Sequence, residues 1–199
     1  LDYYALRGSL VLDLSPDIEN YTIVSYSNSD HVGNFPQMYR ANPGSAIGRA
    51  AVPQVTRLNA SGDPYQVEQT LSNPRSVTKQ FQVINTTKWQ INDNFLVKNI
   101  VSYATFKQGL AQSVFGSNFK PVDLFTAAYN FVVPNSPDAR LSTAQAFNEA
   151  GTFGNDQNTF VEEFQIQGKG ADGKLDFQTG LYYEHSTPGA KTSSESIAI

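Results

Sequence analysis

The sequence predicts an all-β protein whose antiparallel strands form part of a transmembrane β-barrel, and three observations predict it. Six segments alternate in side-chain character, as strands with two different faces do. Tight turns join these segments in pairs, whereas about fifty residues separate one pair from the next. Outer-membrane barrels combine short periplasmic turns with long extracellular loops in this way. All ten prolines fall in the predicted turns and loops, because proline cannot donate to a strand ladder.

The first predicted pair consists of strands at about 3–14 and 20–27, joined by a turn at Ser15-Pro16-Asp17. One face of the first strand is apolar and the other is mostly polar. The apolar positions are Tyr4, Leu6, Leu10, Leu12 and Leu14. We expect this apolar parity to face lipid and the polar parity to face the barrel interior, because the faces of a barrel strand alternate.

The second predicted pair spans about 77–90 and 94–106, with Asn92-Asp93 in the turn. Trp89 lies just before this turn, on the face that also carries Phe81 and Val83. A tryptophan at such a position suits the periplasmic aromatic girdle of a barrel. In a soluble sandwich the same ring would instead lie under a second sheet.

The third predicted pair spans about 159–167 and 174–184. Between them, residues 168–173 match G-x-G-x-x-G, but a dinucleotide site needs a helix after the glycines. The residues from Lys174 onward alternate as a strand, so we interpret the motif as a hairpin turn. Glu162 and Glu163 are neighbours and should point to opposite faces. We expect Glu163 to face the water-filled interior of the barrel, and Glu162 to lie on the outer face near the membrane–water interface.

The two long loops, 28–76 and 107–157, contain aromatic residues and a few cations among Gly, Pro, Asn and Ser. Such long loops are usually functional. Candidate contacts for a ring-bearing or anionic ligand are Tyr39, Arg40, Tyr65, Phe119 and Tyr129. The alternative is that these aromatic residues pack the loops together. Residues 142–150 predict a short helix capped by Ser142 and ended at Gly151.

Composition narrows the possible functions. The 199 residues are 40% hydrophobic and 16% charged, with a net charge of −4 and a pI near 5.1, which argues against a nucleic-acid surface. Zero cysteines exclude disulfides and thiolate metal sites, and two histidines, His31 and His185, are too few for a zinc site. The sequence shows no catalytic constellation, so no enzyme activity, metal or cofactor is predicted.

The chain begins within a predicted strand and ends in another predicted loop, so we expect a piece of a longer polypeptide. Single-chain barrels begin at about 8 strands, and six could not close one.

Three segments resemble barrel hairpins of TonB-dependent receptors, especially those of sphingomonad-type proteobacteria. They are Arg7–Tyr21, then Asn85–Trp89 with Lys98–Tyr103, and then Phe160–Gln167 with Leu175–Tyr183. This resemblance implies an outer-membrane barrel of about 22 strands that is filled by an N-terminal plug. No segment here resembles the plug, and the long loops are unmatched.

The resemblance implies a receptor in the outer membrane of a Gram-negative bacterium. Its partners would be outer-membrane lipid, the rest of the barrel, the TonB complex through the missing plug segment, and an imported ligand. The ligand could be a siderophore, cobalamin, an oligosaccharide or an aromatic compound. Two classes of alternative remain open. The first is a passive porin-type channel. The second is a soluble secreted protein, either a β-sandwich that binds carbohydrate or an all-β glycosidase.

Overall fold

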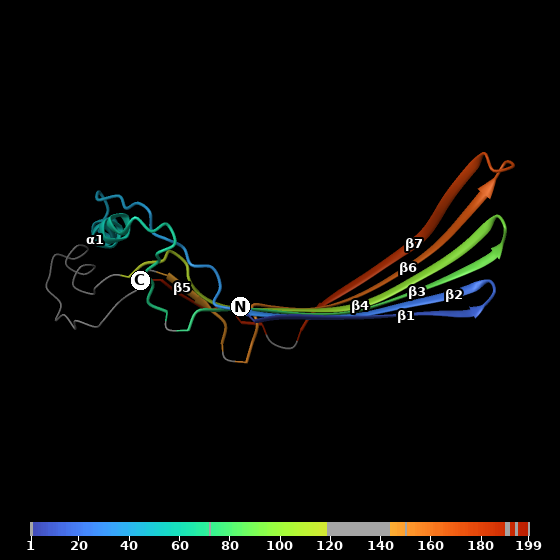
Figure 1. Cartoon of the computed structure of the whole chain (residues 1–199), viewed down its shortest axis with the longest axis horizontal. Coiled ribbons are helices and arrows are strands. Elements are labelled where there is room, and N and C mark those ends of the chain that lie inside the picture. Colours follow the sequence, from blue (N-terminus) through green and yellow to red (C-terminus); the bar gives the residue numbers. More distant parts are fainter. Residues whose placement is uncertain are drawn as a thin grey trace. The chain divides into compact units, whose positions relative to one another are not determined.

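The computed structural model describes residues 2–71, 73–118, 144–149, 151–189, 192–193 and 195–198. Over these residues the chain is all-β, with eight strands and a single α-helix (Figure 1). It divides into two compact units. Unit 1 comprises residues 1–30, 77–108 and 155–192, and unit 2 comprises residues 31–76, 109–154 and 193–199.

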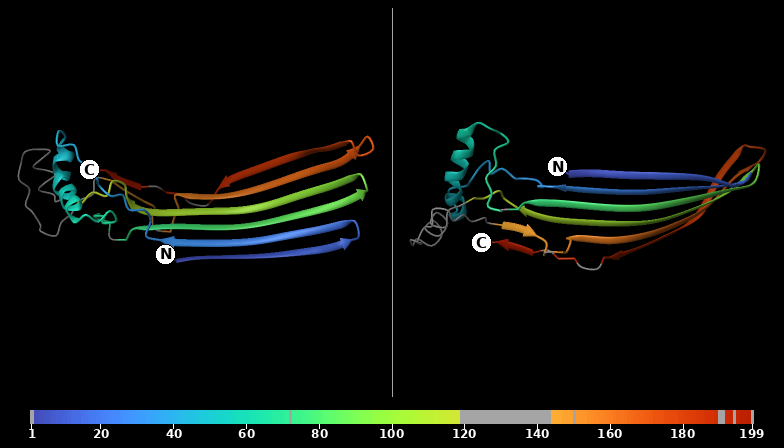
Figure 2. Two further views of the ribbon diagram at one scale, coloured as in Figure 1. Left: turned by 45° about the horizontal axis from the view of Figure 1, so that its top comes forward. Right: turned by 60° about the horizontal axis from the view of Figure 1, so that its bottom comes forward.

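Unit 1 is a single-layer antiparallel sheet. Its strands, which in three cases continue into unit 2, are β1 (Asp2–Ser15), β2 (Ile18–His31), β3 (Arg75–Asn92), β4 (Phe95–Ser113), β6 (Asn155–Gly170) and β7 (Leu175–Pro188). They lie side by side in the order β1-β2-β3-β4-β6-β7 (Figure 2). The sheet is not closed, since within the described residues β1 pairs only with β2 and β7 only with β6. The prediction of six antiparallel strands is confirmed.

The strands are longer than predicted. β1 pairs with β2 from Asp2↔Asp30 onward, and β4 pairs with β6 as far as Gln108↔Asn155. Residues 28–31 are Asn, Ser, Asp and His, which do not look like a strand in sequence. Backbone pairing to an adjacent strand overrides this weak local preference. The connecting segments shrink accordingly to 32–74 and 114–154.

The turn between β6 and β7 confirms the interpretation of the glycine motif. Ala171, Asp172 and Gly173 all have positive φ, at 52°, 54° and 82°, and β7 follows directly. Gly168 is needed for a different reason. A Cβ atom there would lie 2.4 Å from the Phe177 ring and 3.1 Å from the Phe95 ring. Its absence lets these two rings meet edge to face, with centroids 6.1 Å apart.

Unit 2 contains the helix α1 (Ala46–Ser61) and two short strands, β5 (Ala144–Phe147) and β8 (Glu195–Ala198). The Ser45 side chain caps α1 by accepting from the Gly48 amide at 3.0 Å, and Gly62 ends it in the left-handed conformation. β5 pairs with the end of β4 at Ala111–Ser113 and with β8.

Three sequence predictions are wrong in detail. The segment predicted as a helix at 142–150 forms β5 at residues 144–147, because pairing with β4 and β8 outweighs a local cap signal. Residues 142, 143 and 150 of that segment lie outside the described residues. The loop predicted at 28–76 contains α1. Two prolines lie within elements: Pro53 is inside α1, where it removes the amide that would donate to Arg49, and Pro188 ends the edge strand β7.

The packed interior of the described residues is small and is mostly provided by α1. The buried hydrophobic residues are Ala50, Ala51 and Leu58 in α1 and Val77 in β3. Met38 and Ala41 pack against the two alanines. By contrast, every described residue of β7 is exposed. The sheet of unit 1 therefore has two faces, and no layer of described residues packs on either of them.

Candidate functional site

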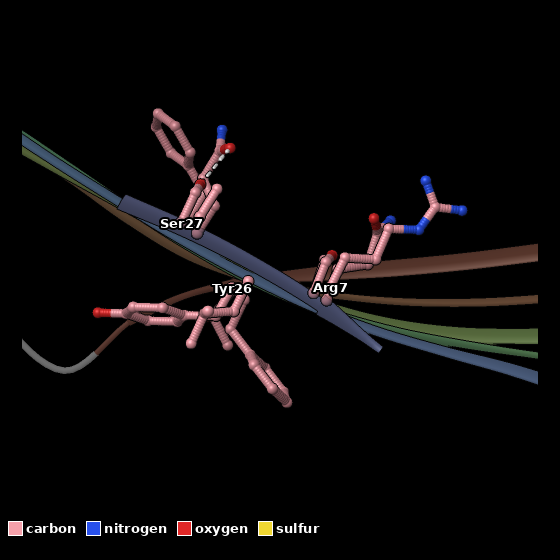
Figure 3. Close-up of a pocket in the computed structure, with 12 residues that line it drawn as sticks. Arg7, Tyr26 and Ser27 are labelled. Carbon is pink, nitrogen blue, oxygen red and sulfur yellow. Dashed lines mark hydrogen bonds between the residues drawn. The ribbon is translucent and has the colours of Figure 1, made fainter. Parts of the chain in front are cut away.

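The two faces of the sheet differ in chemistry. In the β1–β2 pair, Leu6 and Leu10 lie opposite Tyr26 and Thr22, whereas Arg7 lies opposite Ser25 on the other face. Figure 3 shows Tyr26 on the opposite side of the sheet from Arg7 and Ser27. We call the face with Tyr26 the aromatic face and the face with Arg7 the polar face.

Side-chain contacts extend both faces across the sheet. On the aromatic face, Asn20 of β2 contacts Asn85 and Thr87 of β3. On the polar face, Lys88 forms an ion pair with Glu19 at 2.8 Å. A hollow beside Glu19 is lined by Lys88, Gln90 and Leu96, which places the even-numbered residues of β4 on the polar face. The odd-numbered residues of β4 and the even-numbered residues of β6 pair on the aromatic face.

Two rows of rings border the aromatic face. The row near the hairpin turns consists of Trp89, Phe95 and Phe177, and the other row consists of Tyr4, Tyr26, Phe81, Tyr103, Phe160 and Tyr183. Rings meet in both rows: Phe95 with Phe177, Tyr4 with Tyr26, and Phe160 with Tyr183, at centroid distances of 6.1, 5.9 and 6.4 Å.

The spacing of the rows follows from the register. Phe95 pairs with Gly168 and Tyr103 pairs with Phe160, so the rows lie eight residues apart along β4, and they lie six residues apart along β7, between Phe177 and Tyr183. At about 3.3 Å per residue the spacing along β4 is about 26 Å, or about 20 Å across a layer if the strands tilt by about 40°. Leu10, Val83, Val97 and Leu181 lie between the rows. Leu181 is 77% exposed, so nothing in the described chain covers this band.

A chain of hydrogen bonds between amide and carboxylate side chains lies on the polar face of β6 and β7. The Gln167 amide donates to Gln165 at 3.1 Å and to Gln178 at 3.2 Å, and the Gln165 amide donates to Glu163. Glu163 pairs with Ile100 and Tyr182, and Glu162 pairs with Val101 and Tyr183. The two glutamates therefore lie on opposite faces, as the sequence predicts.

A groove of about 440 Å³ lies on the sheet near the β1–β2–β3–β4 seam. The residues around it come from both faces of the sheet: Arg7, Ser25, Ser27, Gln80, Gln82 and Phe106 from the polar face, and Leu6, Tyr26 and Phe81 from the aromatic face. Ser27 donates to Gln80 at 3.3 Å (Figure 3). The Arg7 side chain makes no hydrogen bond or ion pair with the described residues. The guanidinium is thus a charged donor available to a bound molecule. The only sequence signal for Arg7 is its place in the alternation of the first strand, on the face opposite Leu6 and Leu10.

Three of the five predicted ligand contacts lie within the described residues, and their side chains are exposed. Tyr39 is 78% exposed and Tyr65 is 89% exposed, and Arg40 is also exposed. Phe119 and Tyr129 lie outside the described residues. The exposure of Tyr39 and Tyr65 leaves their rings accessible, and their role in ligand binding stays a prediction.

Gln54 of α1 is a position that sequence reasoning missed. Its side chain is 1% exposed, donates to the Gly116 carbonyl at 2.7 Å and accepts from the Asn118 amide at 2.8 Å. Arg57 of the same helix binds both carboxylate oxygens of Glu68, at 3.2 and 2.8 Å. The Gln54 contacts tie α1 to the segment that follows β4, and the Arg57–Glu68 pair ties it to the segment that precedes β3. The only sequence signal is a glutamine at helical spacing from Ala50, Ala51 and Leu58.

Other kinds of site find no support in the part of the chain that the structure describes. No group of three or more histidine, aspartate or glutamate side chains there could hold a metal ion. The described residues also include no helix that is both long and apolar enough to cross a membrane.

Comparison of the chain with models of protein families, with curated proteins and with solved structures gave no match.

Proposed function

We propose that this chain forms part of the barrel wall of an outer-membrane receptor that takes up a scarce ligand by TonB-coupled transport. The aromatic face would contact lipid and the polar face would line the water-filled interior. The observation that carries this proposal is the uncovered aromatic face of a single-layer sheet, bordered by two rows of rings.

The physical argument concerns what such a face requires. A sheet in a water-soluble domain buries its apolar face against a second layer. Leu6, Leu181 and Tyr183 are instead 68%, 77% and 57% exposed. Membrane barrels place an apolar band about 25 Å tall between aromatic girdles, and the two rows, about 20 Å apart across a layer, come close to this height. The open edges of β1 and β7 fit pairing with further strands, because an unpaired edge is costly in lipid.

The receptor function and its energy coupling rest on the resemblance of the three hairpins to TonB-dependent receptors. The groove with Arg7 would contact an anionic part of the ligand, because a guanidinium forms bidentate hydrogen bonds to carboxylate or phosphate. Tyr39, Arg40 and Tyr65 would contribute from segment 32–74. A passive channel would share the wall but would not need an energy source.

Single cysteines test which face meets lipid, since the chain itself has none. A fluorophore would be attached at Leu181→Cys on the aromatic face or at Gln178→Cys on the polar face, in the complete protein in lipid vesicles. We expect spin-labelled lipid to quench the fluorophore at 181 strongly and the one at 178 weakly. Aqueous iodide should show the opposite preference. A soluble sandwich would bury position 181 under protein, and lipid would then quench neither position.

Arg7→Gln tests the groove. If Arg7 binds an anionic group of the ligand, its loss should reduce whole-cell binding of that ligand roughly tenfold or more, since a hydrogen bond to a charged group contributes about 1.5–3 kcal/mol. Arg7→Lys should lose less, because the charge remains. Lys98→Gln is the matched control, because Lys98 lies on the same face but does not line the groove.

Equal losses in Arg7→Gln and Lys98→Gln would indicate a general charge effect and not a site. A protonophore added to the same uptake assay separates the two transport mechanisms. TonB-coupled uptake should stop, whereas passive flow through a porin should continue.

A further inference from the structure

Four polar side chains at the β2–β3 seam lie on the aromatic face, between the two rows of rings, where Asn99, Glu162 and Thr179 of β4, β6 and β7 lie as well. The four at the seam are Asn20 and Thr22 of β2 and Asn85 and Thr87 of β3, and we call them the Asn/Thr quartet. Polar groups without partners are costly in an apolar band. The quartet therefore needs an explanation.

The quartet satisfies its own hydrogen-bond donors. The two amides pair reciprocally, with Asn20 donating to Asn85 at 3.1 Å and Asn85 donating to Asn20 at 2.9 Å. Asn20 also donates to Thr87 at 2.8 Å, and Asn85 to Thr22 at 2.7 Å. The hydroxyls of Thr22 and Thr87 donate to the amide oxygens of Asn20 and Asn85, at 3.3 and 3.4 Å. All six N–H and O–H hydrogens of the four side chains are used.

The arrangement is nearly symmetric, because each strand contributes the pattern Asn-x-Thr and the two strands are antiparallel. Other contacts along the same seam agree with it. Glu19 contacts Lys88, and Ser27 contacts Gln80. Between these contacts each step forward along β2 is matched by one step backward along β3. A single register therefore runs from Glu19 to Ser27 of β2.

The β2–β3 seam lacks the usual means of setting a register. In a hairpin, the tight turn between the two strands fixes their register. β2 and β3 have no such turn, because segment 32–74 joins them. A slip by one residue would move apolar side chains to the polar face, and the alternation opposes it. A slip by two residues keeps every side chain on its face. One slip places Asn20 opposite Asn85, so that each asparagine loses the threonine directly opposite it in the native register. The other places Asn20 opposite Trp89, which moves it four residues away from the position opposite Asn85 and separates the paired amides.

We propose that the Asn/Thr quartet is a register lock, which selects one pairing of β2 with β3 over the pairings shifted by two residues. The lock acts because the native register satisfies every side-chain hydrogen-bond donor of the quartet, and each slipped register separates donors from their present acceptors. A single polar asparagine sets the register of coiled coils by the same principle. The inference rests on the geometry of the seam and not on the proposed transport function.

The lock also matters for segment 32–74, which leaves β2 at His31 and enters β3 at Arg75. A two-residue slip would shift these two ends relative to each other by about 6.6 Å along the strands. The quartet thus fixes the attachment of the segment that carries α1, Tyr39, Arg40 and Tyr65.

Cysteine pairs can report the register directly, because the chain has no cysteine of its own. The pair Ser27→Cys with Gln80→Cys reports the native register. The pairs of Ser27→Cys with Gln82→Cys or with Thr78→Cys report the two slipped registers. Each pair would be oxidised in cells that express the complete protein, and the ratio of slipped to native cross-linking would be measured.

The ratio would be compared between the unaltered quartet and the variant Asn20→Leu/Thr22→Val/Asn85→Leu/Thr87→Val. We expect the ratio to rise at least tenfold in this variant. The control is Ser25→Ala/Thr86→Val, which removes polar groups of β2 and β3 on the polar face, and its ratio should not change. The isosteric pair Thr22→Val/Thr87→Val retains the two paired amides, and its ratio should rise by a smaller factor, about threefold.

The double variant Thr22→Val/Thr87→Val keeps the test decisive if the fourfold variant does not fold. An unchanged ratio in the isosteric pair, with or without a folded fourfold variant, would overturn the proposal. An equal rise in the polar-face control would overturn it as well, because the effect would then belong to polar groups in general.

Discussion

Replacing Leu181 by arginine is expected to destabilise the assembled protein by roughly 2–4 kcal/mol, which is the cost of arginine on the lipid face near the midplane of a barrel. Leu181 lies opposite Phe164 on the aromatic face, between the two rows of rings, and is 77% exposed. In water such an exposed leucine would tolerate arginine with little change. The measurement is unfolding by urea from lipid vesicles, followed by the mobility shift of the folded barrel.

Gln178→Arg is the matched control for this substitution. Gln178 lies three residues away on the same strand, but on the polar face, where it accepts a hydrogen bond from Gln167. We expect a loss below about 1 kcal/mol there, since only one exposed hydrogen bond changes. If both variants unfold at the same urea concentration, the assignment of lipid to the aromatic face is wrong.

The second large effect is expected in unit 2, from Gln54→Leu. The leucine cannot bond the Gly116 carbonyl or the Asn118 amide, and each buried group left without a partner costs about 1–3 kcal/mol. We expect α1 to open more readily, with a fall of about tenfold or more in the hydrogen-exchange protection of its amides. Protection in the β6–β7 hairpin should not change.

Asn59→Leu is the control for Gln54→Leu, because it makes a similar polar-to-leucine exchange at an exposed position of the same helix. Its protection should match that of the unaltered protein. If Gln54→Leu also leaves protection unchanged, the buried amide does not hold α1 in place.

The strands of unit 1 were predictable because their signals are local. Alternation in Tyr4 to Leu14 and in Leu175 to Tyr183 identifies a strand and its apolar face. A glycine such as Gly173 indicates a turn, because glycine readily adopts the positive φ that the turn requires. The ends were less predictable, because Ser29 and Asp30 pair with Tyr3 and Asp2 through the backbone, which any side chain permits.

The remaining features depend on partners distant in sequence. Residues 144–147 form a strand only because Ala111–Ser113 and β8 are beside them. Gln54 is buried because residues 116–118 pack on α1. The Asn/Thr quartet joins Asn20 to Asn85 across 65 positions, so its closed network is visible only once the β2–β3 register is known.

Gly168 has a consequence for the evolution of this sheet. The site above it is shared by the rings of Phe95 and Phe177, which approach from two different strands. A larger residue at 168 would be accepted only after one ring became smaller, and a smaller ring would leave space for a side chain at 168. In homologous chains, these three positions are therefore expected to change together, with roughly constant total volume.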